Sequence, residues 1–113
     1  MAAVELRIMS FNIRTALAQD GPHHWDLRKD LVVDAIRDAN PDLLGIQEPT
    51  AEQWAWLTDA LGLGWSGVAH SRQDTIGTAP HLQGLFYRRG RLVRQGDGCF
   101  WLSDTPDIPG SVS

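Results

Sequence analysis

The segments LRIMSFNIR, residues 6–14, and DLLGIQE, residues 42–48, decide the fold of this chain. Each is a mostly apolar run that ends in a polar side chain, Asn12 in the first and Glu48 in the second. Short apolar runs of this kind are typical of buried strands. Adjacent strands of this type would hold an amide and a carboxylate at their ends. Rigidly placed oxygen ligands of that kind suit a hard divalent cation and a phosphate ester.

Helical patterns flank the second strand. In residues 26–39 the apolar side chains recur at helical spacing, which predicts a first helix with Asp26 as its N-cap. A second helix is predicted from Thr50 to about Gly62, because Thr50 and Gln53 have the spacing of a capping box. The stretch before the first helix has no periodicity and contains a Gly-Pro pair, so we expect a loop there.

After residue 64 the pattern changes to short aromatic and aliphatic segments separated by glycine-containing turns, which predicts antiparallel strands. We expect four of these strands, at residues 64–70, 84–89, 91–95 and 98–103. Arg89-Gly90 lies where a tight hairpin turn would join two of them. Residues 103–113 contain two prolines and no apolar period, and are predicted to be an extended or disordered tail.

The composition is that of one globular domain or part of one, with 113 residues, 42% hydrophobic and 21% charged. No apolar run approaches the ~18 residues of a membrane span, and the N-terminus lacks the pattern of a signal peptide. We therefore expect a soluble, cytoplasmic protein with no membrane partner. The net charge of −4 argues against a general electrostatic grip on nucleic acid. The single Cys99 lies in an aromatic context and is expected to be a buried thiol.

Other polar residues have more than one interpretation. Basic side chains cluster at Arg88, Arg89, Arg91 and Arg94, which favours a solvated hairpin face and leaves a phosphate contact as the alternative. The histidines lack the spacing of a zinc site and are expected at the surface, with His24 kept as a candidate for the rim of a site. Taken alone, Glu48 would suit the N-terminal end of a helix dipole, and Asn12 would suit a structural amide.

Three segments carry a family resemblance: RIMSFNIR, DLLGIQE, and the run from FYRRGRLV to GCFWLSDTPDIPGS. In this order they resemble the N-terminal half of the endonuclease/exonuclease/phosphatase superfamily, which has the deoxyribonuclease I-like fold. The resemblance implies an α/β (α+β) protein built as a four-layered sandwich, with two mixed sheets face to face and helices outside. Residues 1–113 would be the N-terminal part of one such domain and supply about one sheet with its helices.

The resemblance also implies a divalent-metal-dependent phosphoesterase of the nuclease or phosphatase type, with Mg²⁺ or Mn²⁺ as cofactor. It implies that Glu48 ligates the metal, and that Asn12 belongs to the polar network that holds the substrate phosphate. Both residues would be catalytic, and activated water would attack the phosphate ester in line. The substrate would be nucleic acid or a small phosphorylated molecule. The acidic balance of the chain favours a small metabolite or a short nucleic-acid end over long duplex DNA.

The motifs that the family carries in its second half, N-T-H-x-D, G-D-x-N and S-D-H, do not occur in this sequence. Asn12 and Glu48 alone provide about one metal ligand and no general base, so we expect the isolated chain to be a truncated and inactive fragment. Two alternatives remain open. One is a non-catalytic half-domain that pairs with a partner chain, or with itself, through an uncovered sheet face. The other is an anion-binding module that uses the arginines of residues 88–94.

Overall fold

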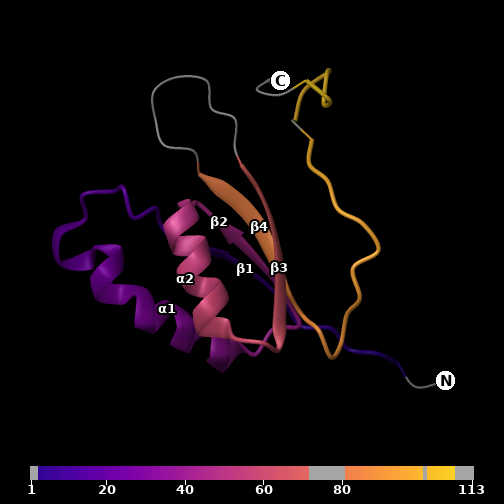
Figure 1. Cartoon of the computed structure of the whole chain (residues 1–113), viewed down its shortest axis with the longest axis horizontal. Coiled ribbons are helices and arrows are strands. Elements are labelled where there is room, and N and C mark those ends of the chain that lie inside the picture. The colour runs from indigo at the N-terminus through magenta and orange to yellow at the C-terminus, as the bar shows by residue number, and fades with distance from the viewer. Residues whose placement is uncertain (1–2, 72–80, 101, 109–113) are drawn as a thin grey trace.

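The structure, a computed structural model, describes residues 3–71, 81–100 and 102–108. Two α-helices, one 3-10 turn and four strands follow one another along these residues (Figure 1). In chain order they are β1 (Ile8–Asn12), η1 (Gly21–His23), α1 (Trp25–Ala39), β2 (Leu43–Gln47), α2 (Ala51–Leu61), β3 (Trp65–Ser71) and β4 (Leu82–Arg88).

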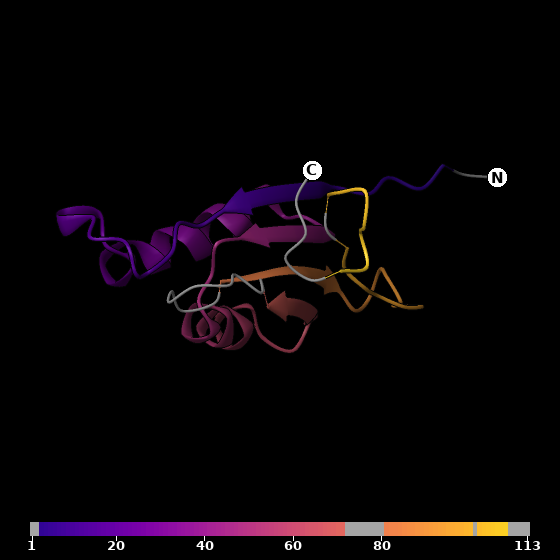
Figure 2. The same cartoon turned by 90° about the horizontal axis from the view of Figure 1, so that it is seen from above.

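The four strands form one mixed sheet in the order β1-β2-β4-β3. β1 and β2 are parallel and are joined through α1, while β4 is antiparallel to both of its neighbours. Figure 2 shows α1 beside β1 and β2, and α2 beside β4 and β3, so that both helices cover the same face of the sheet. The mixed α/β class expected from the sequence is confirmed.

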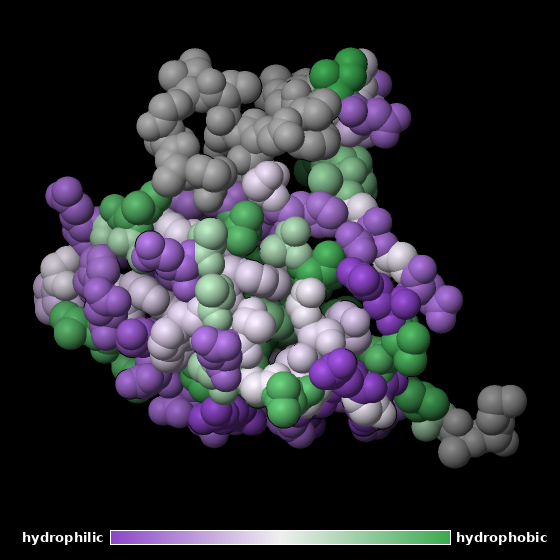
Figure 3. Space-filling view, viewed as in Figure 1, coloured by the Kyte–Doolittle hydropathy of each residue, from purple (hydrophilic) through white to green (hydrophobic). Residues whose placement is uncertain are grey.

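The hydrophobic core lies between the helices and this covered face. Alternate side chains of β2 point into it, because successive residues of a strand face opposite sides of a sheet. The fully buried members include Leu44 and Ile46 of β2, Ile36 of α1 and Leu57 of α2. Around the helices, hydrophilic side chains with scattered hydrophobic ones make up most of the surface in Figure 3. Within the described residues, neither helix is both long and apolar enough to cross a bilayer.

Trp54 of α2 lies flat on two strands because glycine occupies the positions beneath it. Its ring stacks on Phe86 with ring centroids 4.1 Å apart and planes 16° apart. A Cβ atom added at Gly67 would lie 2.8 Å from the ring of Trp54, and one added at Gly84 would lie even closer to it. The indole ring therefore occupies the space that side chains at these two positions would fill, and α2 can approach β3 and β4 closely.

The predicted hairpin at Arg89-Gly90 is wrong. Residues 91–100 form no strand, because both edges of β4 are already paired, with β2 on one side and β3 on the other. The strand predicted at residues 98–103 is therefore absent over residues 98–100, and residue 101 lies outside the described residues. Of the predicted tail, residues 103–108 form bends and turns, while 109–113 lie outside the described part. The other two predicted antiparallel strands are confirmed as β3 and β4.

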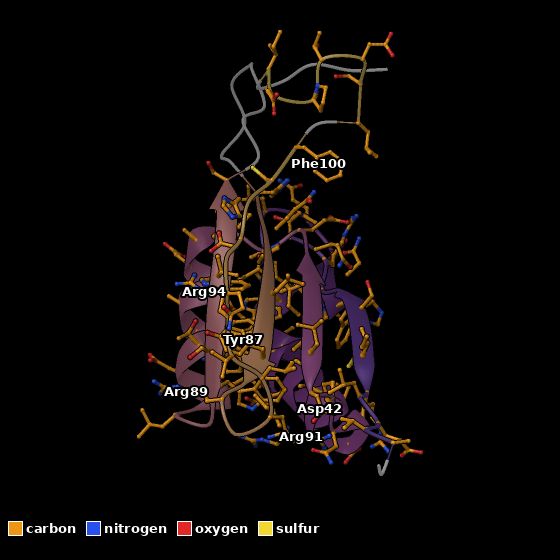
Figure 4. All side chains as sticks on the ribbon, turned by 90° about the vertical axis from the view of Figure 1, so that its right-hand side faces the viewer. Asp42, Tyr87, Arg89, Arg91, Arg94 and Phe100 are labelled. Atoms are coloured by element: carbon orange, nitrogen blue, oxygen red, sulfur yellow. The ribbon has the colours of Figure 1, made fainter. Side chains whose placement is uncertain are left out.

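Residues 91–100 instead run along the sheet face that is turned away from the helices (Figure 4). Asp97 accepts a hydrogen bond from Arg94 at 3.0 Å and pairs with His70 Nε2 of β3 at 2.9 Å. Cys99 in this segment is exposed, and the side chain of Phe100 is 69% exposed, so the expectation of a buried thiol is wrong. The reason is that nothing among the described residues packs over this segment as a further layer.

The same face of the sheet leaves apolar side chains in contact with solvent. Ile8 of β1 is 68% exposed and Leu85 of β4 is 45% exposed, although both lie within strands. They point away from the core because their neighbours Met9 and Phe86 point into it. We call this surface the open face. The sequence predicted an uncovered sheet face of this kind.

Candidate active site

Asn12 and Glu48 meet at the carboxyl edge of the parallel strand pair. Asn12 is the last residue of β1 and lies opposite Gln47, the last residue of β2, so Glu48 follows directly at the same edge. The side-chain amide of Asn12 donates a hydrogen bond from Nδ2 to Glu48 Oε2. The structure thus brings together the two residues that the sequence predicted for the site.

The backbone is strained at this edge. Glu48 has φ 68° and Arg14 has φ 63°, the left-handed region that L-residues rarely adopt. Such a conformation costs about 1–3 kcal/mol per residue, and it persists only where the surrounding structure determines it strongly. Strain of this type concentrates at active sites and ligand clamps. Its occurrence at Arg14 and at Glu48, which both hydrogen-bond Asn12, marks this edge of the sheet as a candidate site.

Arg14 is a residue of this edge that the sequence analysis did not single out. Its backbone N–H donates to Asn12 Oδ1 at 3.0 Å, which leaves the amide nitrogen of Asn12 facing Glu48. Its guanidinium forms two hydrogen bonds of 3.1 Å with the carboxylate of Asp20. The only signal in the sequence was its place two residues after Asn12.

The pairing of these two side chains shifts both pKa values. The hydrogen bond from Arg14 holds the pKa of Asp20 below its ordinary value, with further lowering by the nearby charges of Arg14 and Arg28. The pKa of Arg14 is raised, first by its hydrogen bond to Asp20 and then by the charge of Asp20, with a smaller contribution from Glu48. The negative charges of Asp20 and Glu48 therefore both favour the charged form of Arg14.

Replacing Arg14 by glutamine is expected to raise the pKa of Asp20 toward its ordinary value. A depressed carboxyl pKa stabilises the folded state above the unfolded pKa, and this contribution disappears as the pH falls through the folded pKa. The effect on stability is small because Arg14 is exposed and Asp20 is only half-buried, so that solvent screens the pair. A ¹³C NMR titration of the Asp20 carboxyl in both proteins measures the shift. An identical titration curve in Arg14→Gln would contradict the ion pair.

Two histidines fasten the loop that follows Asn12. His24, kept in the sequence analysis as a candidate for the rim of a site, is the N-cap of α1: its Nδ1 accepts from Asp26 N at 3.2 Å, and its Nε2 contacts Ala16 O at 3.0 Å. The cap expected at Asp26 is therefore wrong by two positions. His81, expected at the surface, is half-buried, and its Nε2 lies 3.1 Å from Thr15 Oγ1. Both rings therefore hold the loop that follows Asn12.

The side chains at this edge of the sheet can supply one ligand to a metal ion. Among the described residues, no three His, Cys, Asp or Glu side chains gather in a way that could hold a metal ion. Mg²⁺ retains several waters and is often bound through one or two carboxylates together with substrate phosphates. The half-buried carboxylate of Glu48 fits that role as a single ligand. A complete site needs additional groups from other residues.

The four arginines near the end of β4 do not form a free anion-binding patch. Arg88 donates to Pro41 O at 3.0 Å, Arg89 to Leu63 O at 3.2 Å, Arg91 to Glu5 O at 2.7 Å, and Arg94 to Asp97 at 3.0 Å. Arg89, Arg91 and Arg94 are spread along the molecule in Figure 4. Three of them reach distant parts of the chain and Arg94 pairs within its own segment, which agrees better with a structural role than with a phosphate contact.

The comparison with known proteins identifies the family. Residues 9–107 match the model of the Endonuclease/Exonuclease/phosphatase family. The chain belongs to this family. Its members are hydrolases that act on phosphate esters, and the recognition made from the sequence motifs is confirmed, as is the deoxyribonuclease I-like fold.

Solved structures of family proteins superpose on nearly all of the chain. A Bacteroides vulgatus endonuclease/exonuclease/phosphatase is 32% identical with a TM-score of 0.81, over 95% of this chain and 40% of that one. The mannosyl-6-phosphatase Bt3783 of Bacteroides thetaiotaomicron is 28% identical with a TM-score of 0.81, over 96% of this chain and 41% of that one. The human Nocturnin catalytic domain, solved with a bound sulfate anion, is 26% identical with a TM-score of 0.62, over 76% and 34% of the two chains.

A curated relative is also similar in part. The uncharacterized protein L388 of Acanthamoeba polyphaga mimivirus is 26% identical in an alignment of 98 residues that covers 77% of this chain and 33% of that protein. The chain thus spans about a third of this curated relative and about 40% of the Bacteroides structures.

Proposed function

We propose that this chain is the N-terminal part of a divalent-metal-dependent phosphoesterase that hydrolyses a phosphomonoester or a phosphodiester. The observation that carries the proposal is the meeting of Asn12 and Glu48 at one strained edge, in a family of phosphate-ester hydrolases. Other residues must supply a second sheet, a general base and the remaining ligands, because this chain lacks the corresponding motifs. We call the chain together with that second half the complete protein.

The two site residues take different roles in this proposal. Glu48 would ligate Mg²⁺ or Mn²⁺ through its carboxylate. When bound, the cation supplies charge neutralisation on the phosphoryl oxygens and the leaving group. Asn12 keeps Glu48 in place through one N–H of its amide, and the amide carries a second N–H that would donate to a phosphate oxygen of the substrate. Both contributions are electrostatic and preorganised, which is the main means of accelerating phosphoryl transfer.

We favour a small phosphorylated molecule, or a short nucleic-acid end, as the substrate. The net charge of −4 opposes the capture of long duplex nucleic acid, and the arginines of residues 88–94 are held by contacts within the chain. Among the similar structures, one is named as a mannosyl-6-phosphatase, which agrees with a phosphomonoester of small size.

The proposal is tested by comparing the chain alone with the complete protein on two substrate classes, phosphomonoesters and phosphodiesters. Phosphate release and strand cleavage are followed with added Mg²⁺, with Mn²⁺ and with EDTA. We expect turnover only in the complete protein, and its loss in EDTA. Turnover that persists in EDTA would refute the metal dependence. Turnover by the chain alone would refute its assignment as one part of the enzyme.

One observation favours a second candidate, a half-domain that associates through the open face. Ile8 and Leu85 are exposed there within regular strands, and exposed apolar patches mark interaction surfaces. Sedimentation of the chain alone distinguishes the two cases. A stable dimer that is dissociated by Leu85→Lys, with no turnover after the second half is added, would favour this candidate over the enzyme.

A further inference from the structure

The side chain of Gln53 is a buried polar group in contact with two separate segments. It is only 1% exposed, although it lies in the first turn of α2. Its Oε1 accepts hydrogen bonds from Thr50 N and from Ala16 N, both at 2.9 Å. Its Nε2 donates to Arg14 O at 3.1 Å. The capping box that the sequence predicted requires only the bond to Thr50 N. The two other bonds reach the loop after β1 and exceed what a cap needs.

These bonds close a ring around the candidate site. Gln53 holds the backbone of Arg14, whose N–H donates to Asn12 Oδ1 at 3.0 Å. Asn12 in turn donates to Glu48 Oε2. Glu48 is two residues from Thr50, where Gln53 closes the ring through Oε1. The loop after Asn12 and the turn that carries Glu48 are thus joined twice, by the hydrogen bond between Asn12 and Glu48 and by the side chain of Gln53.

We propose that Gln53 is a positioning residue that aims the amide of Asn12 at Glu48. It does so by holding Arg14 in its left-handed conformation, so that the backbone N–H of Arg14 engages Asn12 Oδ1. That bond decides which end of the Asn12 amide faces the carboxylate, because oxygen and nitrogen occupy opposite sides of the amide. The catalytic meaning of this role rests on the proposed phosphoesterase function, whereas the geometric role does not.

The first test observes Asn12 directly and requires no activity. In ¹⁵N NMR spectra of the chain, the two side-chain amide protons of Asn12, assigned with Asn12→Asp, should be well separated because Glu48 accepts from one of them. Gln53→Met keeps the length of the side chain and removes its polar atoms, and it should collapse this separation. Leu57→Ala is the matched control, since Leu57 is fully buried on the same helix and is not part of the ring. It should destabilise the chain and leave the Asn12 signals separated.

A second variant adds a rescue by pH. Gln53→Glu keeps both acceptor bonds, but an ionised carboxylate cannot donate to Arg14 O. Burial raises the pKa of such a carboxyl, and once protonated it can donate again. We therefore expect the Asn12 signals of Gln53→Glu to move toward those of the wild type as the pH is lowered. This variant also carries the test if Gln53→Met does not fold.

In the complete protein the same change should act on kcat. A small misplacement of a reacting group can cost up to about a hundredfold, so we expect Gln53→Met to lower kcat by about tenfold to a hundredfold with KM nearly unchanged. Leu57→Ala should retain kcat at a temperature at which it is folded.

The outcomes separate the two proposals. Asn12 signals that change equally in Gln53→Met and Leu57→Ala, or in neither, would overturn the positioning role. Signals that collapse in Gln53→Met alone would support that role. If the wild-type complete protein then showed no metal-dependent turnover, the phosphoesterase assignment would fail while the positioning role remained.

Discussion

Turnover of the complete protein is expected to fall roughly a thousandfold in Glu48→Ala, because a bound metal supplies several kcal/mol of transition-state stabilisation and each 1.36 kcal/mol is a factor of ten. The fold should persist, since Glu48 is half-buried at the edge of the sheet and is not a member of the hydrophobic core. The measurement is kcat/KM over a range of Mg²⁺ concentrations, together with the circular dichroism spectrum of each protein.

A matched control for this variant is Glu52→Ala. Glu52 lies four residues further along, in the first turn of α2, and its side chain is exposed. Both substitutions remove one negative charge from the same region, but only one removes the carboxylate that Asn12 contacts. Near wild-type rates in Glu48→Ala would remove the central claim of the proposed function. An equal loss in both variants would show that net charge is responsible and not metal ligation.

Gly84→Ala is expected to lower the free energy of unfolding by roughly 2–3 kcal/mol, a typical cost of overpacking a close-packed interior. The added methyl group would collide with the ring of Trp54 and would lie 2.8 Å from the carbonyl oxygen of Val68. Trp54 cannot move away easily, because it is stacked on Phe86 and also contacts Gly67. Urea unfolding of the chain, followed by circular dichroism, measures the loss.

Gly45→Ala is the corresponding control on β2. A methyl group there would meet its nearest neighbours at 3.5 Å or more, which is ordinary van der Waals contact. We expect a change within about 1 kcal/mol, and a gain is expected if the reduced entropy of the unfolded chain dominates. If both variants lost the same stability, the loss would come from a general intolerance of alanine in these strands. A collision with Trp54 would then not be its cause.

Local sequence patterns were sufficient to predict the two parallel strands and the two helices. The apolar runs before Asn12 and Glu48 predicted β1 and β2, and helical spacing predicted α1 and α2 to within a few residues. The capping box at Thr50 and Gln53 was also predicted correctly. These features depend on side chains that are close in the sequence, so their signal is contained in short windows.

The errors occurred where an element depends on partners that are distant in the sequence. The hairpin at Arg89-Gly90 satisfied its local turn pattern, but β4 had no free edge to offer. Cys99 satisfied the pattern of a buried residue, but no described layer covers it. The N-cap of α1 is His24 and not the predicted Asp26, because the ring of His24 also reaches Ala16 O across the loop.

The sequence by itself determined the family, the strand pair and the two polar residues at its carboxyl edge, because motif order and hydrophobic period are properties of the chain alone. Only the tertiary structure decided how those residues are held. The left-handed backbone of Arg14 and the ring closed by Gln53 join segments that lie 37 and 39 residues apart. Hydrogen bonds over such separations depend on the packing of α2 against the sheet, and no local pattern of residues encodes that packing.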